Sequence, residues 1–204
     1  TGIQIGESSI KMVQITNGIV SKTAMEATPD NLVRDGHILS FEAMGETLKS
    51  MAKANQMKSR NTVVILPLDI CYLRRTNMPY MTTDQLKLNL PYELRDYIHS
   101  DREDYIYDYA VVREELNDAG EIRSLELIIA AVKKGVIEKY EKILNLAGFK
   151  MKTVVPDACT FRNIIRDYEG KNEVHPETYC VVDLGHSAVR VHLYKGSIYE
   201  TTRI

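Results

Sequence analysis

The stretch QIGESSIK at residues 4–11 decides how this chain folds, because the stretch DLGHSAVR at residues 183–190 repeats its pattern. Both follow the order x-aliphatic-Gly-x-Ser-x-aliphatic-basic, and the second lies 179 residues after the first. Each continues through an alternating strand into a turn with glycine, Asn17-Gly18 or Lys195-Gly196, and then into a second strand. A long repeat offset of this kind indicates an internal duplication of a β-hairpin rather than a tandem array.

Turns of this composition are suited to binding phosphate. Glycine and small hydroxyl residues at a tight turn let backbone N–H groups converge on an anion, and two facing turns would hold a nucleotide from opposite sides. The same residues also suit an ordinary β-turn, with Lys11 on a solvated face and His186 exposed. The candidate phosphate-binding residues are Gly6, Ser8, Ser9, Lys11, Asp183, Gly185, His186 and Ser187.

One acidic residue precedes the second turn. Asp183 is the candidate metal ligand, because Mg²⁺ keeps several waters and takes few carboxylates directly. The equivalent residue of the first copy is Gln4, which carries no charge.

The sequence between the copies predicts an α/β fold. Asn-Gly between β-branched runs predicts a hairpin at residues 3–27, and apolar residues at helical spacing after Ser40 predict a helix. From Cys71 to Gly148 the order β-α-β-β-α is predicted, with Pro91 dividing its first helix. The predicted elements are a helix over 41–57, a strand over 62–66, a helix over 83–98, strands over 105–112 and 122–132, a helix ending at Gly148, a strand at 154–155, a helix over 158–168 and a polar linker over 169–177.

The composition excludes several classes of protein. With 26 Lys and Arg against 28 Asp and Glu in 204 residues, the chain has no general basic field for nucleic acid. Three widely spaced cysteines lack zinc-site spacing and are typical of buried thiols in a cytosolic protein. No apolar run approaches the roughly 20 residues of a membrane span, and the N-terminus lacks the basic-then-apolar layout of a signal peptide. We therefore expect no membrane insertion.

The paired hairpins resemble the two phosphate-binding motifs of the actin-like ATPase superfamily. More narrowly, the chain resembles the N-terminal part of the PilM-type type IV pilus assembly proteins, relatives of the cell-division protein FtsA. The stretches that carry this resemblance are IQIGESSIKMVQI from residue 3, RDGHI at 34–38, VVILP at 63–67, LELIIAAVKKGVIEKYEKILNLAGFK at 125–150 and VVDLGHSAVRVHLYKG at 181–196.

The resemblance implies a domain organisation. It implies an α/β, actin-like (ribonuclease H-like) first domain formed by residues 1–82 and 150–178, with an inserted β-α-β-β-α subdomain at 83–149. Residues 179–204 would begin a second actin-like domain that is truncated. We therefore expect ATP and Mg²⁺ to bind the full-length protein but not this fragment. An exposed hairpin at 180–204 also favours pairing with another chain, so a dimer through it would be a consequence of truncation.

The resemblance also implies a partner and a location. It implies a cytoplasmic adaptor at the inner face of the cytoplasmic membrane that receives the N-terminal peptide of a PilN-like membrane protein. The candidate contacts lie on the helix at 83–99 and are Leu86, Leu90 and Tyr97. Two alternatives remain at this point: an FtsA-like division protein with a C-terminal amphipathic helix, and an actin-fold ATPase or small-molecule kinase.

Two departures from the actin-like pattern affect catalysis. Gln4 stands where these ATPases commonly place Asp, and Val155 stands where many place a Glu before the proline. Asp157 follows Pro156, and a one-residue shift along a strand reverses the direction of a side chain. We assign no catalytic residue and expect ATP hydrolysis to be weak or absent, because no group is placed to orient water.

Overall fold

The computed structural model describes residues 1–99 and 101–204. The chain divides into two compact units, Thr1–Ile70 with Gly135–Asp157 and Cys71–Lys134 with Ala158–Ile204. This division by compactness groups the residues differently from the three predicted domains, and those domain boundaries stay predictions.

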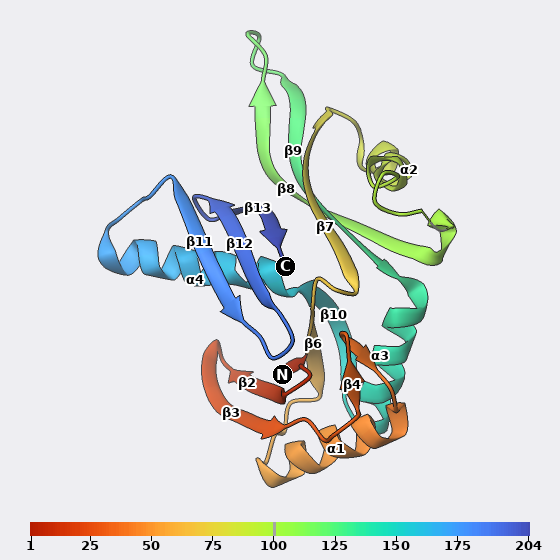
Figure 1. Cartoon of the computed structure of the whole chain (residues 1–204). Helices are drawn as coiled ribbons and strands as arrows, with labels where there is room; N and C mark the ends of the chain where they lie inside the picture. Colours follow the sequence, from red (N-terminus) through yellow and green to blue (C-terminus); the bar gives the residue numbers. More distant parts are fainter. Residues whose placement is uncertain (100) are drawn as a thin grey trace. The chain divides into compact units, whose positions relative to one another are not determined.

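The first unit is built on one mixed sheet with the strand order β10-β6-β1-β2-β3 (Figure 1). Strands β1, β2 and β3 are antiparallel neighbours, whereas β6 runs parallel to both β1 and β10. Asn17 (φ 52°) and Gly18 (φ 77°) form the predicted hairpin turn between β2 and β3. The elements are β1 Gly2–Ile5, β2 Ser9–Thr16, β3 Ile19–Ala27, β4 Val33–Arg34, β5 His37–Ile38, α1 Phe41–Ala54, β6 Asn61–Leu66, α3 Lys134–Leu146 and β10 Lys150–Pro156.

Helix α1 packs its apolar stripe into the core of this unit. The side chain of Ser40 accepts a hydrogen bond from the backbone N–H of Ala43 at 3.3 Å, which confirms the predicted N-cap. Gly45 allows α3 to approach closely, because a Cβ at this position would lie 2.8 Å from the Cβ of Leu146. The core of the unit contains Ile3, Ile5, Ile10, Met12, Met44, Leu48, Met51, Val64 and Leu66.

A buried side chain ends α1 earlier than the predicted residue 57. The Oε1 atom of Gln14 accepts hydrogen bonds from the backbone N–H groups of Lys58 at 2.6 Å and Ser59 at 3.0 Å. Gln56 adopts a left-handed conformation with φ 52°. The Gln14 amide thus satisfies two backbone donors that a longer helix would have used internally, and it ties β2 to the segment 55–60.

The second unit contains two antiparallel sheets, each with a helix against one face (Figure 1). Their strand orders are β7-β9-β8 and β11-β12-β13. The elements are β7 Cys71–Pro79, α2 Thr83–Glu93, a 3₁₀ helix Arg102–Asp104, β8 Tyr105–Leu116, β9 Ile122–Lys133, α4 Asp157–Asn172, β11 Thr178–Leu184, β12 Val189–Lys195 and β13 Ile198–Arg203. The predicted order β-α-β-β-α from Cys71 to Gly148 is confirmed.

Helix α2 covers one face of the β7-β9-β8 sheet. It begins with a capping box between Thr82 and Gln85 and ends at Glu93, two residues after Pro91, rather than at the predicted residue 98. The apolar residues packed between helix and sheet are Met78, Leu86, Leu90, Leu94, Ile98, Tyr105, Leu125, Leu127, Ile129 and Ala131.

Helix α4 covers one face of the terminal sheet. The Tyr194 hydroxyl donates to the carbonyl of Ala158 at 2.6 Å, and the ring of Phe161 lies 5.1 Å from the ring of His192. The helix runs to Asn172, so it takes up the first part of the predicted linker at 169–177. The opposite face of the sheet exposes apolar side chains, among them Val182, Leu184 and Val189.

Candidate functional site

The two copies of the repeated motif form the same turn. In the first copy the N–H of Gly6 donates to the carbonyl of Ser9 at 3.0 Å, and in the second the N–H of Gly185 donates to Ala188 at 3.0 Å. A Cβ on Gly6 would lie 2.9 Å from the Ser9 oxygen, and one on Gly185 would lie 2.8 Å from the Ala188 oxygen. The duplication predicted from the sequence therefore extends to the backbone, and both turns require glycine.

The two turns also place a cation at the same register position. Lys11 lies directly opposite Gln4, and Arg190 lies directly opposite Asp183. The Nη1 atom of Arg190 is 3.2 Å from where a Cβ on Gly185 would sit, so its guanidinium packs against the second turn. The sequence interpretation omitted Arg190 from the candidate residues, although the shared basic position of the repeat pointed to it.

The predicted residues of the first turn lie together at the β1–β2 connection. Ser8 and Lys11 are exposed, whereas Gly6 and Ser9 are half-buried. Thr28 anchors this turn, because its hydroxyl donates to the Gly6 carbonyl at 2.7 Å and its N–H donates to the Ser8 carbonyl at 3.1 Å.

The RDGHI segment also supports the first turn. It forms the β4–β5 hairpin, and the N–H of Gly36 donates to the carboxylate of Glu7 at 3.3 Å. Gly36 has φ 72°, a conformation that favours glycine.

The second turn joins β11 and β12. Asp183 is half-buried near the end of β11, and the turn residues Gly185, His186 and Ser187 are exposed. Within residues 1–99 and 101–204, no three His, Cys, Asp or Glu residues gather as a metal site. A single carboxylate still suits hydrated Mg²⁺. The two turns belong to different units, so joint binding of one nucleotide stays a prediction.

A buried histidine lies on the strand that leaves the second turn. His192 is fully buried, and its Nδ1 lies 2.8 Å from the Oγ1 atom of Thr202. Its Nε2 has no hydrogen-bond partner in the described part of the chain. Burial lowers the pKa of His192 and nearby Arg190 lowers it further, while Asp183 acts in the opposite direction. This shift favours the neutral form of the imidazole.

The residues at the position where many actin-like ATPases place a carboxylate for hydrolysis lie at the end of β10. Val155 is half-buried and pairs with Ile65 of β6. Asp157 is buried at the first position of α4, where a carboxylate suits the positive end of the helix. Expectations about weak hydrolysis rest on these identities and stay predictions.

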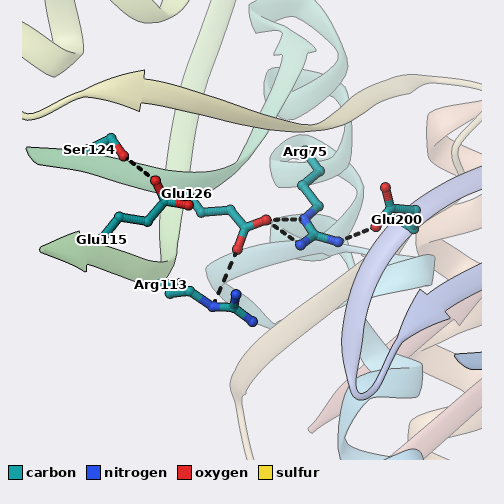
Figure 2. A network of polar contacts seen from close by, with 6 residues as sticks. All are labelled: Arg75, Arg113, Glu115, Ser124, Glu126 and Glu200. Carbon is teal, nitrogen blue, oxygen red and sulfur yellow. Dashed lines mark hydrogen bonds and ion pairs between the residues drawn. The ribbon is translucent and has the colours of Figure 1, made fainter. Parts of the chain in front are cut away.

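A polar network joins the two sheets of the second unit (Figure 2). The Arg75 guanidinium forms ion pairs with Glu126 of β9 and Glu200 of β13, and Arg113 of β8 lies 3.8 Å from Glu126. The side chains of Arg75 and Glu126 are only 14% and 15% exposed. This network attaches the terminal sheet to the β7-β9-β8 sheet.

The predicted partner-binding residues do not share one surface. Leu86 and Leu90 are buried between α2 and its sheet, so the structure corrects their assignment as peptide contacts. They face inward because the apolar stripe of α2 packs against the sheet. Tyr97 is exposed, and the guanidinium of Arg74 lies 5.1 Å from its ring centre.

The other face of the β7-β9-β8 sheet is more open. Register places Leu73 of β7 beside Ala130 of β9, and Ile128 beside Ala110 of β8. These residues alternate with those under α2, and they are half-buried or exposed. The same face carries Arg75, which pairs in register with Ile128, and Glu126, so these apolar side chains lie beside the attachment of the terminal sheet.

A sequence model of the type IV pilus assembly protein PilM matches residues 2–203. The chain belongs to the PilM family. The match covers both turns and every element between them. A search of curated protein sequences found no significant match.

Solved structures similar to this PilM-family chain agree on its fold. The PilM–PilN type IV pilus biogenesis complex matches with a TM-score of 0.82 and 21% identity, over 99% of this chain and 60% of that chain. The cytoplasmic domain of EpsL, an inner-membrane component of the type II secretion system of Vibrio cholerae, matches at 0.59 and 19%, over 99% and 69%. A Bacteroides thetaiotaomicron protein of unknown function with an actin-like ATPase fold matches at 0.51 and 10%, over 98% and 67%.

These likenesses confirm the predicted actin-like α/β fold. The PilM-family chain spans about 60% of the matched chain in the PilM–PilN complex. In the described part of the chain, no helix has the length and apolar character needed to cross a membrane.

Proposed function

We propose that this PilM-family chain acts in type IV pilus assembly as a cytoplasmic adaptor for the N-terminal peptide of a PilN-like inner-membrane protein. The observation that carries the proposal is the family match over residues 2–203. The similar structure solved as a PilM–PilN complex supports the class of partner.

The face of the β7-β9-β8 sheet opposite α2, beside the Arg75 network, is the surface that we assign to the peptide. It presents half-buried Leu73, Ile128 and Ala130, and β7 and β8 form the two edges of the sheet. An extended peptide can hydrogen-bond to such an edge and place alternate side chains on the apolar face. This assignment replaces Leu86 and Leu90, which lie on the covered face.

The twin turns are the part of the chain that we assign to ATP and Mg²⁺. Exposed Ser8 and Ser187, the cations Lys11 and Arg190, and the carboxylate of Asp183 suit a phosphate chain with hydrated Mg²⁺. The metal would supply charge neutralisation on the phosphates. We expect binding in a protein that has both actin-like domains in full, with slow hydrolysis.

Peptide binding can be tested by fluorescence polarisation with a labelled peptide from the N-terminus of the PilN-like protein of the same genome. We expect saturable binding, and we expect Ala130→Glu to weaken it at least about tenfold because it places a charge directly beside the apolar side chain of Leu73. Leu88→Glu is the matched control, since Leu88 is exposed on the far side of α2.

Far-UV circular dichroism shows whether each variant is folded. Absence of binding at near-millimolar peptide would contradict the adaptor role. Equal weakening by the Leu88 variant would contradict only the choice of surface.

A further inference from the structure

Strand β3 is the last strand of the five-stranded sheet, and among the described residues no strand pairs with it on the side away from β2. It is nine residues long and contains no proline. Proteins commonly protect such edges with proline, with short strands or with charged side chains that extend into solvent, because an open edge can pair with another chain. Strand β3 has neither of the first two protections.

The strand also exposes apolar side chains. Ile19 is 72% exposed, Met25 is 69% exposed and Val20 is 57% exposed. Ile15 of β2, which pairs with Val20 in the ladder, is also exposed. Side chains of this kind on an unpaired edge gain from contact with a second strand.

The two charges of β3 are drawn toward the body of the unit. The Nζ atom of Lys22 donates to the carbonyl of Gln56 at 2.6 Å, and the carboxylate of Glu26 accepts from the Nδ2 atom of Asn55 at 3.4 Å. Lys22 pairs in register with Gln14, and Glu26 pairs with Ile10, so both lie on the face that α1 covers. Lys22 and Glu26 are four residues apart, about 13 Å along the strand, so they are too far apart to form an ion pair within one copy.

We propose that two copies of this chain associate by antiparallel pairing of their β3 strands about a two-fold axis at Ala24. In this register Lys22 of each copy lies opposite Glu26 of the other, which forms two equivalent ion pairs. Met25 of each copy lies opposite Thr23, so the two methionines flank the axis on the other face. The two sheets become one continuous sheet, and the interface is isologous.

Charge selects this register over its neighbours. Opposite residues of an antiparallel pair share a face, so an axis perpendicular to the sheet passes through one residue. An axis at Lys22 would place Lys22 opposite Lys22 of the other copy. An axis at Thr23 would place Lys22 opposite Ala24, so no ion pair would form. Like charges directly opposite each other destabilise a sheet, whereas opposite charges stabilise it.

Sedimentation velocity of the purified chain, from micromolar to near-millimolar concentration, tests the proposal. We expect a reversible dimer. Lys22→Glu and Glu26→Lys should each weaken it at least about tenfold, because each creates two like-charge pairs. An equimolar mixture of the two variants should regain the dimer, since every opposed pair is then complementary. Lys49→Glu, on an exposed position of α1, should have no effect.

Glu26→Lys leaves the Lys22 hydrogen bonds in place, so it still tests the ion pairs if Lys22→Glu fails to fold. In that case Glu26→Gln, which removes the charge without reversing it, should weaken the dimer less than Glu26→Lys does. A chain that stays monomeric at every concentration overturns the proposal. So does a dimer that both charge variants leave unchanged, or one that Leu184→Thr alone abolishes, which would place the contact on the terminal sheet.

Discussion

Gly6 and Gly185 occupy positions where a side chain would meet a backbone oxygen. Because that oxygen belongs to the turn itself, the turn must open to admit a methyl group. We expect Gly185→Ala to lower the free energy of unfolding by about 1–3 kcal/mol, measured by urea denaturation.

Gly170 provides the control for this substitution. It lies within α4 with nothing within 4 Å of an added Cβ. Gly170→Ala should stabilise the chain by about 0.5–1 kcal/mol through helix propensity. An equal loss from both substitutions would argue against a special requirement at the turn.

The buried imidazole of His192 makes stability depend on pH. Its pKa is lowered in the folded chain, so unfolding is accompanied by proton uptake once the pH falls below the ordinary histidine pKa. The stabilisation that neutral His192 provides is present above about pH 6.5 and is lost as the pH falls toward the lowered folded-state pKa.

Urea denaturation at pH 7.5 and pH 5.5, values on either side of about pH 6.5, measures this effect. We expect His192→Asn, whose amide can replace the Nδ1 contact with Thr202, to lose less stability over this interval than the unchanged chain. The same loss in both would assign the pH dependence to other groups.

At the scale of elements, the Arg75 network is the polar link between the two sheets of the second unit. Arg75 donates from several nitrogens at once to Glu126 and Glu200. If the Arg75 side chain is shortened, the largely buried Glu126 keeps only the more distant Arg113 as a charged neighbour among the residues of Figure 2. We expect Arg75→Met to lower the free energy of unfolding by about 1–3 kcal/mol.

Lysine should restore only part of that loss, because it lacks the planar fork of arginine. Arg95→Met is the control, since the Arg95–Asp96 pair is well exposed on both sides and should contribute less than about 1 kcal/mol. A loss from Arg75→Met no larger than the control would show that the two sheets hold together without the network.

Local patterns predicted the elements that depend on neighbouring residues. Asn17-Gly18, the Ser40 cap and the stop at Gly148 each act within a few positions, and the structure confirms them. The end of α1 could not be predicted this way, because Gln14 is distant in sequence from the residues that it binds.

The same limit explains the errors at the candidate sites. Leu86 and Leu90 are apolar residues at helical spacing, a pattern typical of a helix packed on a core and of a helix that binds a peptide. Only the position of the sheet decides between these alternatives. The repeat could have identified Arg190 as a candidate residue, because it occupies the same position as Lys11. Its close approach to Gly185 depends on the folded hairpin and could not be predicted from the sequence.

For the whole molecule, the family match and the shared turn geometry are two independent observations that agree with an actin-like fold containing a duplicated hairpin. The match concerns residues 2–203 as a sequence, whereas the repeated Gly–carbonyl hydrogen bond concerns the backbone. The proposed adaptor role and the proposed β3 association are assigned to different surfaces of the chain. Loss of the dimer in the charge variants should therefore leave peptide binding unchanged.

The Gln14 amide has a consequence for protease resistance. Lys58 is an exposed trypsin cleavage position, yet its backbone N–H and that of Ser59 are held by one side chain from β2. A protease must extend this segment to cleave it, and the amide opposes that local opening. We expect Gln14→Ala to accelerate tryptic cleavage after Lys58, as followed by mass spectrometry, well before the rest of the chain is digested.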